Sequence, residues 1–220
     1  MTVGDLVRGT VRLVVDHFLL LFTIAFVGTL ATTAVQYMLG AAVGEEMSVL
    51  VIVIGLFLSA VINGLLCLSA WDAREGAAPD PMEDLNTAFR MAFPLLGVTL
   101  AVVLMIAFGF VLLIIPGLFA MTVFSVSVPA LLLERPISMM DAMIRSTELT
   151  RGYRWQAFGG LIVIAALGLF LMIALAPAAS ATGAVIMYSV VVNTVLLLLS
   201  TAYLVELYGQ LRDAPRITAD

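Results

Sequence analysis

Lysine is absent from this chain of 220 residues, and cysteine and histidine occur once each. The single cysteine, Cys67, excludes an intramolecular disulfide, and the scarcity of cysteine and histidine excludes the usual ligand clusters of a zinc site. Charged residues are also scarce, at 11%, whereas 63% of the residues are hydrophobic. Soluble domains have roughly 25% charged and about half apolar residues, so this composition indicates an integral membrane protein.

What the chain has instead is a series of long apolar stretches. A helix needs about 20 apolar residues to cross the hydrocarbon of a bilayer. Six stretches have about that length, at about residues 18–40, 48–71, 92–115, 117–134, 155–176 and 182–207. We therefore expect an all-α integral membrane fold, with six transmembrane helices in a single polytopic domain over residues 1–220.

A short break separates the third and fourth stretches, at Ile115, Pro116 and Gly117. Proline removes a backbone donor, and glycine tolerates a reversal of the chain. We therefore expect a tight turn at these three residues rather than one very long helix.

The arginines are distributed unevenly between the connections. They are Arg8, Arg12, Arg74, Arg90, Arg135, Arg145, Arg151, Arg154, Arg212 and Arg216. With six spans, all of them fall on the same side of the membrane, and the connection between the first two spans carries Glu45 and Glu46 instead. Because cationic connections stay in the cytoplasm, we expect both termini to be cytoplasmic, in a bacterial inner membrane.

Three charged segments, one ahead of each odd-numbered span, are expected to form short amphipathic helices. They cover about residues 3–14, 80–90 and 138–151. Asp80 followed by Pro81, and Ser138 followed by Asp141, are typical of helix N-termini, and Gly152 is a typical stop signal. We expect these helices to lie on the cytoplasmic face of the membrane, and soluble connecting helices are the alternative. The chain would then consist of three units of interfacial helix plus transmembrane hairpin.

Three segments carry a resemblance to a known family: IIPGLF, PALLLERPISMMDAMIRSTELTRGYRWQAFG and AYLVELYGQLRD. They resemble the membrane domain associated with glycerophosphoryl diester phosphodiesterases and its stand-alone bacterial relatives. The matching positions are Pro116, Gly117, Glu134, Ala142, Arg145, Ser146, Leu149, Thr150, Arg151, Gly152, Tyr208, Leu211 and Arg212.

This resemblance implies a membrane fold and location, but no catalysis. In that family the phosphodiesterase activity belongs to a separate soluble barrel, which uses paired acids, histidines and a divalent metal. This chain has no room for such a domain. We therefore expect a non-enzymatic protein without a cofactor.

Few polar residues lie deep in the predicted spans. Gln36, Asn63 and Asn193 are the deepest, and such side chains commonly form hydrogen bonds between helices. A path for a polar substrate is the functional alternative. Nearer the cytoplasmic ends, we expect Glu134 to pair with the adjacent Arg135 and Glu206 to pair with Arg212, and a proton-coupled role for Glu206 is the alternative.

Three functions fit these observations. The first is a module that binds lipid or a partner protein through its cytoplasmic helices, where Arg145, Arg151 and Arg154 would engage anionic headgroups. The second is a small transporter or channel, with a polar path near the three deep polar residues. The third, an intramembrane enzyme, lacks a recognisable acid–base pair. A polar cavity near the middle of the membrane would favour transport, whereas a dry core with grooves at the cytoplasmic interface would favour the binding module.

A protein partner or a second copy of the chain is compatible with the first function. Nucleic acid is not an expected partner, because the net charge of the chain is −5 and a nucleic-acid surface needs an excess of basic residues.

The arginine distribution predicts which connections are accessible from outside the cell. With Cys67 replaced, single cysteines at Glu45 and Ala179 should react with a membrane-impermeant thiol reagent applied to intact cells. Cysteines at Ala78 and Met139 should react only after the membrane is permeabilised. Labelling of either of these two in intact cells would contradict the six-span topology.

Overall fold

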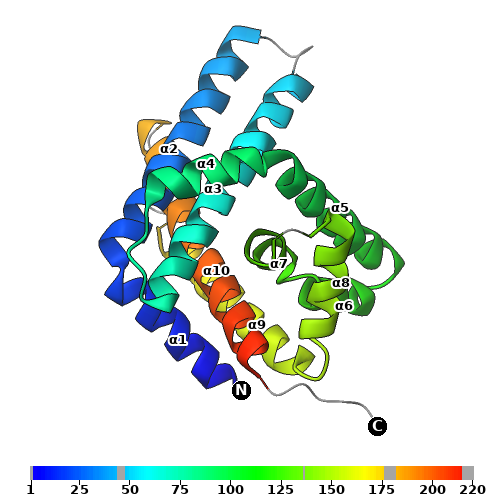
Figure 1. Ribbon diagram of the computed structural model, residues 1–220. Helices are drawn as coiled ribbons and strands as arrows, with labels where there is room; N and C mark the ends of the chain where they lie inside the picture. Colours follow the sequence, from blue (N-terminus) through cyan, green and yellow to red (C-terminus); the bar gives the residue numbers. More distant parts are fainter. Residues whose placement is uncertain (1, 44–47, 136, 176–181, 215–220) are drawn as a thin grey trace.

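The computed structural model describes residues 2–43, 48–135, 137–175 and 182–214 (Figure 1). Every regular element in these ranges is a helix. They are α1 (Val3–Asp16), α2 (Phe18–Val43), α3 (Ser48–Glu75), α4 (Pro81–Arg90), α5 (Ala92–Leu112), α6 (Ile114–Val123), α7 (Ser127–Leu133), α8 (Met139–Leu149), α9 (Arg154–Leu175) and α10 (Thr182–Asp213). Glu45, Glu46, Ala179 and Arg216 lie outside the described residues.

Within these ranges, six helical stretches are long and apolar enough to cross a membrane. They are Phe18–Leu39, Val51–Glu75, Ala92–Leu112, Ile115–Leu133, Arg154–Ala174 and Met187–Asp213. Each overlaps one of the predicted spans. The protein is therefore an all-α, multi-pass membrane protein, as its composition predicted.

Helix α10 forms the centre of the bundle (Figure 1). It contacts α1, α2, α3 and α9, and in its second half Tyr203, Val205 and Leu207 are completely buried. The Tyr203 hydroxyl donates a hydrogen bond to the carbonyl oxygen of Ala157 on α9, at 2.7 Å. The ring lies against Gly160, where any side chain would overlap it. Small residues on α9 thus allow the two helices to approach closely.

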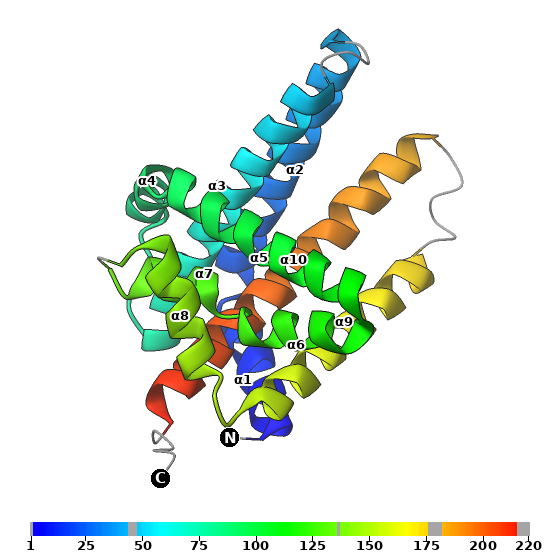
Figure 2. The ribbon, with the colours of Figure 1, turned by 90° about the vertical axis from the view of Figure 1, so that its right-hand side faces the viewer.

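Two hairpins diverge on the side of the molecule away from the termini. Figure 2 shows the α2–α3 hairpin and the α9–α10 hairpin separating toward their tips, with both ends of the chain at the opposite side. On these hairpins large apolar side chains such as Val27, Leu169 and Phe170 are exposed. Exposed apolar faces suit contact with lipid, because acyl chains are as apolar as the side chains themselves.

The turn between the third and fourth spans lies at a different residue from the one that we expected. Helix α5 ends at Leu112, Leu113 is extended, and α6 already begins at Ile114. Pro116 and Gly117 therefore lie in the first turns of α6, where a proline sacrifices no helical hydrogen bond. Gly117 has another role, because its Cα would lie 2.8 Å from a Cβ added at Gly109. The two glycines let α5 and α6 pack backbone against backbone.

The fourth span is divided into α6 and α7. The break follows Val123, and Pro129 lies in the first turn of α7. A proline cannot donate to the carbonyl group four residues earlier, and its ring clashes with that group. The helix therefore restarts at Ser127. The sequence predicted this span as one element because Ser125 is the one polar residue among the three at the break, beside the apolar Phe124 and Val126.

The structure has a helix at each of the three positions ahead of the hairpins. Asp80 caps α4 by accepting hydrogen bonds from the backbone of Met82 and Glu83, and Ser138 and Asp141 form a capping box on α8. Gly152 has φ +88°, a left-handed conformation that suits glycine after a helix end. Helix α1 also begins with a capping box, formed by Thr2 and Asp5, which the sequence analysis missed. The depth of these helices in a membrane stays a prediction.

Helix α4 is held on α3 by a buried hydrogen bond. The Ser69 hydroxyl donates to Oδ2 of Asp84 at 2.6 Å, and Asp84 is buried. Burial raises the pKa of the Asp84 carboxyl, the Ser69 hydrogen bond lowers it, and the neighbouring carboxylates of Asp72, Asp80 and Glu83 raise it further, so the pKa stands above its usual value. The folded state therefore binds the proton of Asp84 more tightly than the unfolded state does.

This shift predicts how stability depends on pH. The contribution of protonated Asp84 is fully present below the ordinary carboxyl pKa and is lost as the pH rises through the higher pKa of the folded state. Asp84→Asn removes this pH-dependent contribution. The melting temperature of the variant minus that of the wild type should therefore be more positive at pH 7 than at pH 4. Asp5 is the control of opposite sign, because its hydrogen bond with Thr2 lowers its pKa. Asp5→Asn should destabilise more at pH 7 than at pH 4.

Thermal unfolding of the detergent-solubilised variants at the two pH values measures both differences. If Asp84→Asn changes the melting temperature by the same amount at pH 4 and pH 7, the pKa of Asp84 is not raised in the folded state.

Candidate functional site

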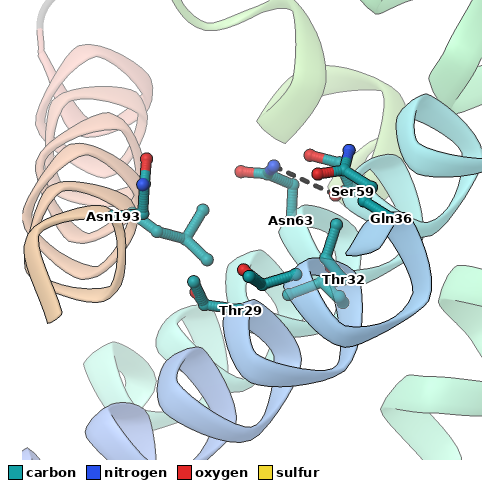
Figure 3. A pocket seen from close by; sticks show the side chains of 9 residues that line it. Thr29, Thr32, Gln36, Ser59, Asn63 and Asn193 are labelled. Carbon is teal, nitrogen blue, oxygen red and sulfur yellow. Dashed lines mark hydrogen bonds between the residues drawn. The ribbon is translucent and has the colours of Figure 1, made fainter. Parts of the chain in front are cut away.

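Gln36, Asn63 and Asn193 line one cavity of ≈ 230 Å³ between α2, α3 and α10 (Figure 3). The remaining lining residues are Thr29, Thr32, Thr33, Ser59, Ile62 and Leu197. Seven of these nine side chains are polar, and none is charged. The structure thus unites the three deep polar residues that the sequence analysis had singled out.

Helical spacing brings the other polar residues to the same place. On α2, Thr29, Thr32, Thr33 and Gln36 follow one another at intervals that put them on one face of a helix. On α3, Ser59 precedes Asn63 by one turn. The sequence analysis missed the threonines, although their spacing was visible, because isolated threonines are common in apolar helices.

The two asparagines are oriented by their own helices. Asn63 Nδ2 donates to the carbonyl oxygen of Ser59 at 3.0 Å, and Asn193 Nδ2 donates to that of Ser189 at 2.7 Å. Each of these bonds lies within one helix. The sequence analysis had given hydrogen bonds between helices as the common role of such side chains. Figure 3 shows the Asn63 carboxamide directed across the cavity toward Asn193.

Gln36 reaches across to α3 and lies against Gly55. A side chain added at Gly55 would overlap the Gln36 carboxamide, so α3 needs a glycine at this position. Gln36 and Asn193 are both exposed. The cavity therefore reaches the surface of the protein at these two residues.

Toward the end of the bundle that holds α1, the same helices pack tightly. Leu66 and Ala70 on α3 are each 1% exposed, and Leu198 and Ala202 on α10 are 3% and 1% exposed. All four belong to the main apolar core. An apolar layer therefore follows the polar cavity along the bundle axis.

Beyond this layer lies an ion pair between Arg74 of α3 and Glu206 of α10. Arg74 Nε lies 3.0 Å from Glu206 Oε2, and the two side chains are 19% and 12% exposed. Gly9 of α1 covers Glu206, because a Cβ at Gly9 would lie 2.5 Å from Oε1. The expected pairing of Glu206 with Arg212 is wrong. The two residues lie six positions apart on one helix, so their side chains point about 120° away from each other.

Arg212 binds elsewhere. Its Nη2 lies 3.1 Å from Glu75 Oε1, and its guanidinium lies over the ring of Trp71, 4.5 Å from the centroid. The arrangement joins the ends of α3 and α10 a second time.

A larger cavity, of ≈ 490 Å³, lies beside the Arg74–Glu206 pair. Its lining residues are Gly9, Arg12, Leu13, Asp16, His17, Ala73, Arg74 and Glu206. Arg12 and Asp16 form an exposed pair at 3.4 Å, so acidic and basic groups balance at this site. Among the described residues, no group of three or more His, Cys, Asp or Glu side chains could hold a metal ion.

A second polar cluster joins α7, α8 and α10. Arg145 Nε lies 2.9 and 2.8 Å from the two carboxylate oxygens of Glu134, and the Tyr208 hydroxyl donates to Glu134 Oε1 at 2.9 Å. Burial lowers the pKa of Arg145, but its bonds to Glu134 and Glu148 raise it, with a net increase. The expected Glu134–Arg135 pair is wrong, because Arg135 Nε instead donates to the carbonyl oxygen of Leu132.

Five of the thirteen residues that carry the family resemblance lie in or beside this cluster. Besides Glu134, Arg145 and Tyr208, the Ser146 hydroxyl donates to the Val123 carbonyl oxygen at 2.7 Å, which the helix break leaves free. The Thr150 hydroxyl donates to the carbonyl oxygen of Ser146. Arg145, which we expected to engage lipid headgroups, is thus bound inside the protein.

Arg151 and Arg154 differ from Arg145. Arg151 is exposed, and the guanidinium of Arg154 lies over the ring of Phe119, 4.7 Å from the centroid. Neither forms an ion pair with an acidic residue in the part of the chain that the structure describes.

Comparison with known proteins adds no relative, because no family model, no curated protein and no solved structure matches this chain. The resemblance to the phosphodiesterase-associated membrane domain stays a prediction.

The cluster around Glu134 predicts that the arginines of this segment are not equivalent. Arg145→Gln leaves Glu134 without its charged partner, and a hydrogen bond to a charged group contributes about 1.5–3 kcal/mol. We expect a loss of unfolding free energy of that order. Arg151→Gln, which removes an equal charge from an exposed position, should change the stability by less than about 0.5 kcal/mol. Thermal and urea unfolding in detergent measures both, and equal stabilities of the two variants would contradict the role of the cluster.

Proposed function

We propose that this protein is a small transporter that admits a polar solute through the cavity between α2, α3 and α10. The observation that carries the proposal is the polar lining of this cavity. Hydrocarbon offers no hydrogen bonds, and each unsatisfied polar group in it costs several kcal/mol. Thr32, Asn63 and Asn193 each satisfy one donor on their own helix, but the remaining polar atoms of the seven side chains need water or a solute as a partner.

The packing on one side of the cavity supports a transporter rather than an open channel. Leu66, Ala70, Leu198 and Ala202 are buried between the cavity and the Arg74–Glu206 pair. A solute that enters the cavity must wait for this layer to open before it can leave on the other side. Alternating access of this kind is typical of secondary transporters, whose substrate sites lie near the middle of the membrane.

The arginine distribution suggests which side is open. If the termini are cytoplasmic, the apolar layer and the ion pair close the cytoplasmic end, and the diverging hairpins face the outside. The described conformation would then be one that receives its solute from outside a bacterial inner membrane.

A lipid- or partner-binding module is less well supported by the site. Such a module called for a dry core, grooves at the cytoplasmic interface and free arginines on the cytoplasmic helices. The cavity of ≈ 490 Å³ beside Arg74 and Glu206 is compatible with such a groove. Arg145 is engaged by Glu134, and the core contains a polar cavity. Arg151 and Arg154, which have no ion-pair partner among the described residues, are what remains in favour of headgroup binding.

Solute exchange across vesicles tests the proposal. Purified protein in phosphatidylcholine vesicles should accelerate the exchange of at least one solute from a panel of small neutral, zwitterionic and ionic compounds, as measured by stopped-flow light scattering against protein-free vesicles. Thr32→Phe places a bulky ring in the cavity and should reduce this acceleration by more than tenfold.

Thr23→Phe is the matched control. Thr23 lies on the same helix and, like Thr32, donates its hydroxyl to the carbonyl group four residues earlier, but it does not line the cavity. This variant should exchange solute like the wild type. The proposal fails if no solute in the panel crosses faster than in protein-free vesicles, or if the two phenylalanine variants behave alike.

A further inference from the structure

Three side-chain oxygens at the cavity, on Thr32, Asn63 and Asn193, accept no hydrogen bond from the described residues. The carbonyl oxygens of Ser59 and Ser189 can only accept hydrogen bonds, so each must face the amide nitrogen of the asparagine that contacts it. One of the two N–H groups of each amide, on Asn63 and on Asn193, is therefore engaged by the backbone, and the other can still donate. Their Oδ1 atoms, which have lone pairs but no protons, have no hydrogen-bond donor among the described residues.

Thr32 adds a third acceptor. Its hydroxyl proton points to the carbonyl oxygen of Gly28, at a distance of 2.9 Å, so the oxygen keeps only lone pairs for the cavity. Thr29, Thr33 and Ser59 have hydroxyls that either donate or accept, and Gln36 offers one group of each kind. The lining thus has four oxygen atoms that only accept, three hydroxyls that do either, and the remaining amide N–H groups of Gln36, Asn63 and Asn193, which donate.

The cavity also lacks a charge to balance an ion. Asp72, the nearest charged residue along α3, lies about 14 Å from Asn63 at ~1.5 Å per residue, on the far side of the apolar layer. An ion in the cavity would have no counter-charge, and an unpaired charge at this depth is expensive. At ≈ 230 Å³, the space is also smaller than the roughly 300–1,000 Å³ of typical ligand pockets.

We infer that the solute is a small, neutral molecule with several hydrogen-bond donors, of the class of short polyols. Its hydroxyl protons would bind the Oδ1 atoms of Asn63 and Asn193 and the Oγ1 atom of Thr32. This inference rests on the proposed transport function and names its substrate class.

Two probes of the same carbon skeleton separate donors from acceptors. Glycerol has three hydroxyls, whereas its trimethyl ether keeps the three oxygens and has no donor. In the vesicle assay, the protein should accelerate glycerol exchange, relative to protein-free vesicles, at least tenfold more than exchange of the ether. Choline and acetate, as a cation and an anion of similar size, should show no acceleration.

Variants then assign the selectivity to the acceptors. Asn63→Leu and Asn193→Leu keep the size of the side chain and remove the acceptor, and each should reduce accelerated glycerol exchange by about tenfold, which is the equilibrium factor for one hydrogen bond of ordinary strength. Thr32→Val should reduce it as well. Thr23→Val removes an equivalent hydroxyl of the same helix outside the cavity and should have no effect, which controls for a general weakening of α2.

The outcomes distinguish the two proposals. Equal acceleration of glycerol and its ether, or faster exchange of choline or acetate, would overturn the substrate class and leave transport standing. Glycerol exchange that is the same in Thr32→Val and both leucine variants as in the wild type would overturn the assignment to these acceptors. If no probe is accelerated, both proposals fail.

Discussion

The bilayer interior gives polar groups no partner other than the protein itself, and most features of this structure depend on that constraint. Charged side chains gather at the end of the bundle that holds the termini, where two acidic groups that lie between helices have a basic partner and Asp84 has the Ser69 hydroxyl. Glu206 binds Arg74, and Glu134 binds Arg145 and Tyr208. The polar groups that lie deeper are uncharged and surround a shared cavity. The chain thus contains two polar regions with different chemistry, separated by apolar packing.

Helix α10 connects the two regions. Its second half is buried among α1, α2, α3 and α9 and carries both Glu206 and Tyr208. Asn193 belongs to its first half, where the helix meets α2 and α3 at the cavity. Ion pairs join one end of this helix to α3. At the other end the α2–α3 and α9–α10 hairpins diverge (Figure 2). The arrangement closes the bundle on one side and leaves space within it on the other.

Glycine and small residues decide how closely these helices approach. Gly9 admits Glu206 beneath α1, Gly160 admits the ring of Tyr203, and Gly55 admits Gln36. At each position a larger side chain would push one helix away from a polar group that it covers. Close approach therefore matters here for polar contacts as well as for apolar packing. Gly109 and Gly117 bring α5 and α6 together in the same way without a polar partner.

Local features of the sequence determined the fold class, the six spans and the ends of the short helices, because span length and helix capping depend on residues that are close together in the chain. Asp80, Ser138 and Gly152 have the capping roles that their positions predicted. The turn at Leu113 and the break before Ser127 were not visible, since mostly apolar residues occupy both places and the proline lies a few positions further on. Only the tertiary structure decided which charges pair. Closeness in the sequence suggested that Glu134 pairs with Arg135 and Glu206 with Arg212. The side chains of consecutive residues, and of residues six positions apart on one helix, point apart. The true partners, Arg145 and Arg74, come from other helices. The sequence also identified Gln36, Asn63 and Asn193 as unusual, yet whether three separate polar residues form interhelical bonds or one cavity depends on the relative rotation and tilt of α2, α3 and α10. Those quantities are set by packing over the whole bundle, not by any one segment of the chain.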